Sequence, residues 1–334
     1  MTSAPLLFQE IGGTPTCRKL SQAFYARVER DPLLRPLFPG TTFRCAIEEF
    51  AAFLVQFLGG PGEDSQRRWW LSLRESHRRF QIDGRHRDAW LHHMDGALDD
   101  AGIEEPARGA LRNFFEQASA YLIEAKPAAR RMTRELTRRW GGQQALDSAV
   151  AAIREGDAVR AGKFALGCDR AVLPGVLALM ISTGDDSLLR FVHERLAADP
   201  ALAHERYGGR TLLHAAAGAG SLTTVELLLQ LGADPNAPDG GKHTPLYSVG
   251  NECAGAEGAE VVHALVRNGA RVDAHDGVTG ATALHMAARR GNAVVAKALL
   301  DCGADKTARD RRGDTPLQRA INCKKGYLAE LLRP

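Results

Sequence analysis

One histidine in the first third of the chain has the surroundings that a metal ligand needs. Between Leu73 and Phe80, the side chains of Leu73, His77 and Phe80 fall on one helical face and the arginines fall on the other. The imidazole of His77 therefore lies in an apolar stripe. Such a histidine is either a structural residue with satisfied hydrogen bonds or a ligand, because iron binding requires a neutral imidazole on a rigid helix beside a flat apolar slot.

Two aromatic residues carry polar atoms that a bound ligand could use. Tyr25 follows Phe24 directly, and Trp90 belongs to the run DAWL that begins at Asp88. Both residues can equally be plain core aromatics. A buried phenol or indole N–H needs a hydrogen-bond partner, so either group could instead donate to a ligand that carries negative charge.

The segments that hold these residues are predicted to be helices. Leu20, Phe24 and Val28 recur at helical spacing, and a second apolar and aromatic stripe covers residues 50–58. The glycines at 59–60 are a helix stop signal at the end of that stripe. No strand pattern competes, so the front of the chain is predicted to be a small all-α domain.

The order and spacing of these motifs resemble one known family. The motifs are a Gly-Gly pair near the start, FY ahead of DPLLRPLFP, FLVQFLGGP, a histidine sixteen residues after that proline, and HRRFQI followed by RDAWL. In these features residues 8–126 resemble a truncated haemoglobin, the shortened two-over-two globin fold, and most closely its second group. The resemblance implies haem b, an iron cofactor, with His77 as its proximal ligand. The distal side of the haem would then be formed by Tyr25, Phe38, Ala46, Phe50 and Trp90.

The same resemblance implies how the distal side would treat a gas ligand. Ala46 takes the position where longer globins often have a histidine, so Tyr25 and Trp90 would be the hydrogen-bond donors. Two donors to bound oxygen imply slow oxygen release. Phe50 is bulkier than the family leads us to expect at its position, which bears on pocket volume and on ligand access.

The back half of the chain repeats one tetrapeptide pattern. TLLH, TPLY, TALH and TPLQ begin at intervals of 33, 38 and 33 residues, the first of them at Thr211. In each clear repeat a short alanine-rich helix follows, and then a leucine-rich helix that ends in Gly-Ala; the final repeat is cut short. This pattern resembles the ankyrin repeat, with about five repeats, the first two degenerate and the last a short cap. The resemblance implies that His214 and His285 bond backbone between neighbouring repeats and that the stack docks a partner protein.

Charge is distributed unevenly along the chain, although the net charge is only +3. Residues 127–145 hold five arginines against the single acid Glu135, a local charge of +4, and they include the pair Gly141-Gly142. We interpret this stretch as a solvated basic linker or connecting helix between a globin domain, 1–126, and the repeats, 146–334. A docking patch for an acidic partner or nucleic acid is the alternative. No nucleic-acid motif or interleaved aromatic residues support nucleic-acid binding.

Composition excludes several classes of protein. With 44% hydrophobic and 25% charged residues, the chain is typical of a soluble globular protein. The six cysteines show neither a CxxC pair nor the spacing of zinc ligands, which predicts reduced thiols and a cytoplasmic location. No apolar run is long enough to cross a bilayer, so no membrane partner is predicted.

Three functions fit these patterns. In the leading hypothesis, an all-α protein binds oxygen or another diatomic gas at a truncated globin and uses an ankyrin-repeat solenoid to dock a partner protein. In the second, the haem is enzymatic and either converts nitric oxide to nitrate with bound oxygen or reduces peroxide, tuned by Tyr25 and Trp90. In the third, the protein is an ankyrin adaptor whose globin has lost haem. Whether the chain is an enzyme stays open.

Overall fold

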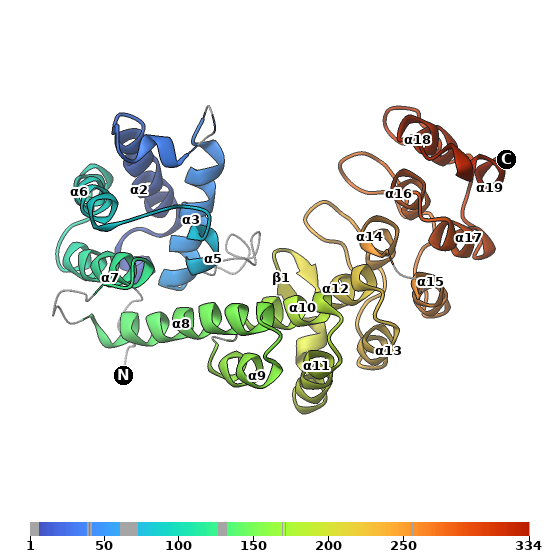
Figure 1. Cartoon of the computed structure of the whole chain (residues 1–334), viewed down its shortest axis with the longest axis horizontal. Coiled ribbons are helices and arrows are strands. Elements are labelled where there is room, and N and C mark those ends of the chain that lie inside the picture. Colours follow the sequence, from blue (N-terminus) through green and yellow to red (C-terminus); the bar gives the residue numbers. More distant parts are fainter. Residues whose placement is uncertain are drawn as a thin grey trace. The chain divides into compact units, whose positions relative to one another are not determined.

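The computed structural model of the chain describes residues 7–38, 40, 42–60, 73–125, 132–168, 170, 172–254 and 257–333. These residues form helices and one short hairpin, so the predicted all-α class is confirmed (Figure 1). The chain divides into two compact units. The first consists of residues 1–150 with 167–169, and the second of residues 151–166 with 170–334.

Helices α2, α3, α6 and α7 form the body of the first unit. Helix α2 packs against α3 and α6, and α6 packs against α7. Helix α3 also contacts α7, because Phe57 stacks on Phe114 with ring centroids 4.1 Å apart. The elements of this unit are α1 (Leu7–Glu10), α2 (Gly13–Val28), the 3-10 helix η1 (Arg35–Leu37), α3 (Arg44–Leu58), α5 (Leu73–His77), α6 (Gly84–Ala101), α7 (Ala107–Leu122) and most of α8 (Arg134–Arg154).

Two glycines set the ends of α2 and α3. Gly12 precedes α2 with φ 94°, and Gly59 follows α3 with φ 90°, a left-handed conformation that a side chain would strain. The helix end at Gly59 agrees with the stop signal that the glycines at 59–60 form in the sequence. Pro61, which follows these glycines in the motif FLVQFLGGP, lies outside the described residues.

Helix α8 is a continuous helix that contributes to the core of the first unit. Leu136 and Trp140 are only 1% and 6% exposed. The indole ring of Trp140 meets Phe114 and Tyr121 edge to face, with centroids 5.9 and 5.2 Å away. The glycine pair whose composition indicated an exposed boundary lies inside α8, one residue after this buried indole. Leu136 and Trp140 therefore belong to the core of the first unit.

The second unit is a row of helix pairs. Helices α10, α12, α14, α16 and α18 pack in sequence, and a second row runs through α11, α13, α15 and α17 (Figure 1). The strands β1 and β2 pair antiparallel between α11 and α12. The elements are α9 (Ala158–Gly167), α10 (Leu173–Thr183), α11 (Asp186–Ala198), η2 (Pro200–His204), β1 (Arg206–Tyr207), β2 (Arg210–Thr211), α12 (Leu212–Ala219), α13 (Leu222–Gln230), α14 (Pro245–Glu252), α15 (Gly258–Arg267), α16 (Ala283–Arg290), α17 (Ala293–Asp301), α18 (Pro316–Asn322), η3 (Gly326–Leu328) and α19 (Ala329–Leu332).

Two buried histidines join neighbouring repeats. Nδ1 of His214 accepts the backbone N–H of Thr211 at 3.1 Å, and Nε2 donates to the carbonyl of His243 at 3.1 Å. His285 bonds backbone in the same way, with Nε2 3.1 Å from the carbonyl of Asp314. The backbone bonds predicted for these two side chains are thus present. In the last repeat Gln318 replaces histidine, and its Oε1 accepts the N–H of the threonine that starts the repeat at 2.8 Å.

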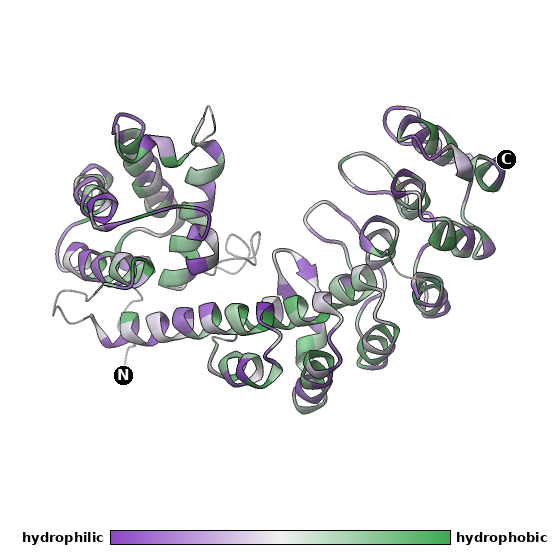
Figure 2. Cartoon of the chain, viewed as in Figure 1, coloured by the Kyte–Doolittle hydropathy of each residue, from purple (hydrophilic) through white to green (hydrophobic). Residues whose placement is uncertain are grey.

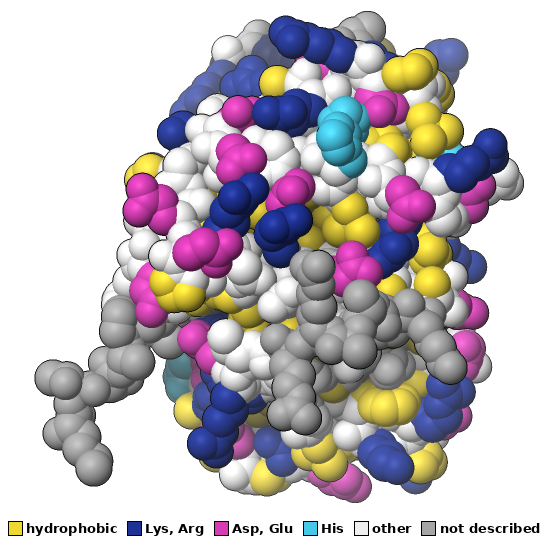
Figure 3. All heavy atoms as spheres, turned by 90° about the vertical axis from the view of Figure 1, so that its left-hand side faces the viewer, with side chains coloured by type: hydrophobic (Ala, Val, Ile, Leu, Met, Phe, Trp, Pro, Cys, Tyr) yellow, Lys and Arg dark blue, Asp and Glu magenta, His cyan; other side chains and the backbone are white. Residues whose placement is uncertain are grey.

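Hydrophobic residues are distributed as these packing rows require. In Figure 2 helix α10, with the sequence LPGVLALMIST, is largely hydrophobic, and most of its residues are buried between neighbouring helices. On the face of the first unit drawn in Figure 3, basic and acidic side chains are interspersed. None of the described helices combines the length and the apolar composition of a membrane span.

Candidate functional site

His77 is oriented by the backbone of its own helix. It is the last residue of α5, and its Nδ1 donates to the carbonyl oxygen of Leu73 at 2.8 Å. The hydroxyl of Ser76 lies 3.0 Å from the same nitrogen. A ring nitrogen held by a carbonyl carries the proton, so Nε2 keeps its lone pair. This is the tautomer that a metal ligand needs.

The protonation state of His77 also suits a ligand. Burial lowers the pKa of this imidazole, because the charged form loses its hydration. The hydrogen bond to Leu73 acts in the opposite direction, and the positive charge of Arg79 adds to the lowering. The ring is therefore neutral at physiological pH.

Tyr25 lies in the middle of an aromatic cluster. Its side chain is 9% exposed. Its ring stacks on Phe43 with centroids 5.2 Å apart, and it meets Phe38 and Phe50 edge to face at 5.5 and 6.4 Å. Phe38 follows η1, and Phe50 is on α3, so elements distant in the sequence meet at this phenol.

Trp90 approaches the same cluster from α6. Its ring lies 5.2 Å from that of Phe24, 5.5 Å from Phe115 and 6.5 Å from Phe50. Because Phe50 touches both Tyr25 and Trp90, it lies between the two predicted donors. The bulky side chain of Phe50, noted in the sequence, is thus packed against both Tyr25 and Trp90.

Ring contacts also connect the cluster to His77. The imidazole lies 6.0 Å from the ring of Phe80, and Phe80 lies 5.6 Å from Phe38. Ala46 packs against the same core from α3. The six residues predicted for the haem site are therefore gathered in one region of the first unit: Tyr25, Phe38, Ala46, Phe50, His77 and Trp90.

Two polar atoms in this region are left without partners. Neither the hydroxyl of Tyr25 nor the indole nitrogen of Trp90 forms a hydrogen bond with a described residue. Burial raises the pKa of the Tyr25 phenol, which therefore keeps its proton and remains a donor. Tyr25 is buried and Trp90 is half-buried, and neither polar atom is wholly enclosed by the described residues. A donor at the edge of an aromatic cluster that has no protein partner is free to bond a ligand.

A haem site needs few protein ligands. Among the described residues no three His, Cys, Asp or Glu side chains gather in a way that could hold a bare metal ion. Haem iron requires only an axial side chain from the protein, because the porphyrin supplies the four equatorial nitrogens. One neutral imidazole beside an aromatic cluster with two free donors therefore fits haem.

A contact between Asp31, which follows α2, and His93 on α6 joins these two parts of the first unit. Oδ1 of Asp31 accepts the N–H groups of Leu33 and Leu34, each at 2.8 Å. Its Oδ2 lies 2.6 Å from Nε2 of His93, one helical turn after Trp90. The hydrogen bond from His93 lowers the pKa of Asp31. The helix that carries Trp90 is thus tied to the segment that follows the helix of Tyr25.

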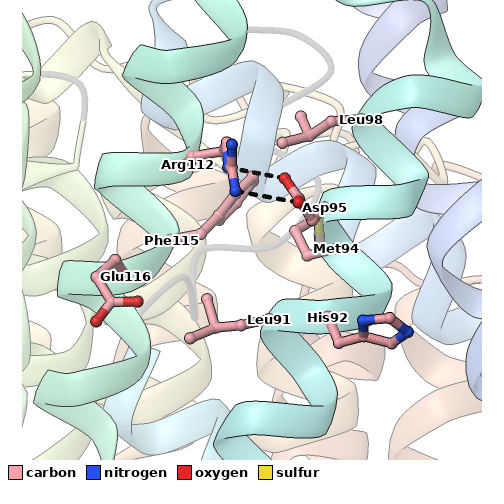
Figure 4. Close-up of a pocket in the computed structure, with 8 residues that line it drawn as sticks. All are labelled: Leu91, His92, Met94, Asp95, Leu98, Arg112, Phe115 and Glu116. Atoms are coloured by element: carbon pink, nitrogen blue, oxygen red, sulfur yellow. Dashed lines mark hydrogen bonds and ion pairs between the residues drawn. The ribbon is translucent and has the colours of Figure 1, made fainter.

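A separate pocket of about 340 Å³ lies between α6 and α7 (Figure 4). Its wall carries the ion pair of Arg112 with Asp95 at 2.8 Å. None of the six predicted residues lines it, so it is distinct from the predicted haem site. Phe115 connects the two regions, since it lines this pocket and its ring also contacts Trp90. The lining residues are Leu91, His92, Met94, Asp95, Leu98, Arg112, Phe115 and Glu116.

Sequence reasoning missed Phe43 and Phe115, two members of the aromatic cluster. Phe43 is 7% exposed and stacks on Tyr25. The guanidinium of Arg35 lies 4.9 Å above the Phe43 ring and donates to the carbonyls of Phe38 and Gly40. The sequence offers only an isolated aromatic residue just before α3, with no periodic pattern to mark it.

Comparison with known proteins identifies both parts of the chain. Residues 6–122 match the bacterial-like globin family, and residues 208–240 and 251–333 match ankyrin repeats. A group 2 truncated haemoglobin of Lotus japonicus is 33% identical over 120 residues, covering 35% of this chain and 71% of its own length. One from Bacillus subtilis is 33% identical over 116 residues, covering 35% of this chain and 87% of its own.

One solved structure is similar to the same part. The haemoglobin of Chloroflexus aurantiacus, a thermophilic phototrophic bacterium, shares 44% sequence identity and covers 36% of this chain and 98% of its own, with a TM-score of 0.34. The two relatives above each share at least 30% identity over most of their length with the first part of this chain. The chain therefore belongs to the truncated haemoglobin family of bacterial-like globins, has group 2 members among its relatives, and carries ankyrin repeats after the globin.

Proposed function

We propose that the protein binds haem b and takes up oxygen or another diatomic gas at its globin, while its ankyrin repeats dock a partner protein. The observation that carries the proposal is the pairing of a neutral His77, whose Nε2 is left for a metal, with two unpartnered donors on Tyr25 and Trp90. Family membership supports the cofactor, since globins hold haem.

Each residue has a defined part in this proposal. The haem would supply the iron that takes up the gas. His77 holds the cofactor through Nε2, and the carbonyl of Leu73 keeps its ring in one orientation. Phe38 and Phe50 exclude water from the ligand side, because both pack in the aromatic cluster. Tyr25 and Trp90 donate hydrogen bonds into that space.

The second unit supports the docking role. Two of its histidines, His214 and His285, bond backbone between repeats, so they are committed to structure. Its last repeats leave large apolar side chains in solvent, with Val278 63% and Tyr327 67% exposed. A stack of repeats with such side chains is suited to protein recognition. The thiols at Cys17, Cys45 and Cys302 are free, which supports the cytoplasmic location that we propose.

The absorption spectrum of the purified full chain, reconstituted with haem, tests the globin half. We expect a Soret band at one haem per chain and a stable ferrous oxygen complex. If the chain takes up no haem, the gas-binding proposal is wrong, and the ankyrin adaptor whose globin has lost haem becomes the favoured function. Rapid turnover of nitric oxide or peroxide by the haem-loaded chain would instead favour the enzymatic alternative.

A further inference from the structure

A carboxylate outside the globin-matched segment holds the first turn of the helix that carries His77. Asp147 is on α8, beyond residues 6–122, and is only 3% exposed. Its Oδ1 accepts the N–H of Leu73 at 2.8 Å, and its Oδ2 accepts the N–H of Arg74 at 3.4 Å. These are the first two residues of α5 in the part of the chain that the structure describes, which resumes at Leu73. The contact spans 74 residues of sequence.

The other neighbours of Asp147 keep its side chain in place. The side-chain amide of Gln143, one turn earlier on α8, donates to Oδ1 at 3.3 Å. The side chain of Tyr121, near the end of α7, is hydrogen-bonded to the same carboxyl group. Burial raises the pKa of that phenol to about 12, and the charge of Asp147 adds to the shift. The carboxylate is thus fixed by α7 and α8 while it holds α5.

Helix α5 needs such an external partner. Its described part, Leu73–His77, has five residues, and a helical segment this short forms few internal hydrogen bonds and is unstable by itself. Asp147 supplies the acceptors that the structure describes for the N–H groups of Leu73 and Arg74. Its negative charge is also favourable beside N–H groups that point towards it. The position of α5 therefore depends on this carboxylate.

The backbone of Leu73 connects Asp147 to the imidazole of His77. The N–H of Leu73 is bound by Asp147, and the carbonyl of Leu73 accepts the Nδ1 proton of His77, both at 2.8 Å. Movement of the first turn of α5 would displace the carbonyl that orients the ring. The guanidinium of Arg74 lies 4.2 Å above the ring of Tyr121 and adds a second contact between α5 and α7. That contact does not involve the Leu73 backbone.

We propose that Asp147 is a positioning residue for the proximal histidine, acting through the backbone of Leu73. The proposal rests on the proposed role of His77 as haem ligand. It places a determinant of the haem site on α8, which begins at Arg134. The match to the bacterial-like globin family ends before this helix, at residue 122. A globin domain that ends at residue 126 would lack this determinant.

The experiment uses the full chain with Asp147→Ala and Asp147→Asn, and Ser148→Ala as the matched control. Ser148 is the next residue on α8, and its hydroxyl bonds within the helix to the carbonyl of Gln144 at 2.8 Å. Asparagine keeps one acceptor oxygen, so Asp147→Asn should preserve part of the constraint. Should Asp147→Ala fail to fold, Asp147→Asn against Ser148→Ala carries the comparison.

The first measurement is hydrogen exchange of the Leu73 and Arg74 amides in the haem-free chain. We expect Asp147→Ala to speed exchange at both amides at least tenfold, with a smaller effect for Asp147→Asn and none for Ser148→Ala. This arm does not depend on haem, so it remains informative if the proposed cofactor is wrong. Unchanged exchange in Asp147→Ala would overturn the proposal.

The second measurement is the iron–histidine stretching band of the ferrous haem-loaded chain, together with the rate of haem transfer to apomyoglobin. We expect Asp147→Ala to shift or split the band and to speed haem transfer at least tenfold, with partial rescue in Asp147→Asn. A lower melting temperature with a wild-type band and wild-type transfer rate would mean that Asp147 only stabilises the fold. That result would also overturn the proposal.

Discussion

The carbonyl oxygen of Leu73 lies 2.8 Å from Nδ1 of His77, one turn later on the same short helix. The bond fixes both the tautomer and the orientation of the ring, because a carbonyl can only accept. It leaves Nε2 with a lone pair and no proton. A histidine prepared in this way by its own backbone needs no carboxylate partner to act as an iron ligand.

Replacing this histidine should remove most of the bound haem. We expect His77→Ala to lower the haem content per chain strongly, because the substitution deletes the nitrogen that would bind the iron. The measurement is Soret absorbance against protein concentration after reconstitution. His92→Ala is the control, since His92 is exposed on α6 and should keep full loading. A wild-type deoxy spectrum in His77→Ala would rule out His77 as the ligand.

Removing either distal donor should speed oxygen release. Tyr25→Phe and Trp90→Phe each delete a hydrogen bond of about 1.5 to 3 kcal/mol to a charged acceptor, or roughly tenfold to a hundredfold in rate. Stopped-flow release of oxygen and carbon monoxide from the ferrous chain measures this. Carbon monoxide is the poorer acceptor and should respond less. Equal acceleration of both gases would point to a steric effect and contradict the donor role.

The repeat junction at His214 should make stability depend on pH. Burial lowers the pKa of His214 to about 4, whereas an unfolded histidine titrates near 6.5. Below pH 6.5 the unfolded chain therefore binds a proton that the folded chain does not. Stability is fully present above pH 6.5 and falls towards pH 4, by up to about 3 kcal/mol.

Substitution by glutamine isolates this contribution. Gln318 makes the equivalent backbone bond in the last repeat without a titrating group. We expect His214→Gln to cost about 1 kcal/mol at pH 7 and to reduce the loss of stability between pH 7 and pH 5. Urea unfolding followed by circular dichroism at both pH values measures it. The same pH dependence in wild type and variant would show that His214 does not titrate as stated.

Two adjacent positions on α8 should respond in opposite directions. Trp140→Ala empties a buried site and should destabilise the chain by about 3 to 5 kcal/mol. Gly141→Ala should stabilise it by about 0.5 to 1 kcal/mol, because a Cβ there meets no atom within 4 Å and helical glycine is unfavourable. Thermal unfolding checks both. A destabilised Gly141→Ala would argue against a helix at this position.

The sequence predicts the local features of the globin well and its long-range contacts poorly. Helical periodicity placed His77 and Phe80 on one face, and the structure has their rings 6.0 Å apart. The family resemblance brought Tyr25 and Trp90 to one site, and ring contacts through Phe50 join them. Neither pattern could pair Asp147 with Leu73, because such a contact depends on how α8 packs and leaves no periodic trace.

The basic stretch before the repeats shows what composition alone leaves out. Five arginines and a glycine pair indicated a solvated linker or connecting helix. The structure buries Leu136 and Trp140, spaced four residues apart on one face of α8. Two apolar residues at that spacing were a weak but readable signal, and the surrounding charge obscured it. Charged side chains on the remaining faces of a helix do not prevent one stripe from entering a core.

The link from Asp147 to His77 passes through the main chain of Leu73. Substitutions of the side chain at position 73 should therefore leave this link intact. Any residue type except proline supplies the N–H that Asp147 binds, and every residue type supplies the carbonyl. In a saturation screen, position 73 should therefore accept other apolar residues of similar size while rejecting proline. At position 147 the acceptor is the side chain itself, so most substitutions there should remove the link. Covariation between the two positions would be weak, although the contact between them is direct.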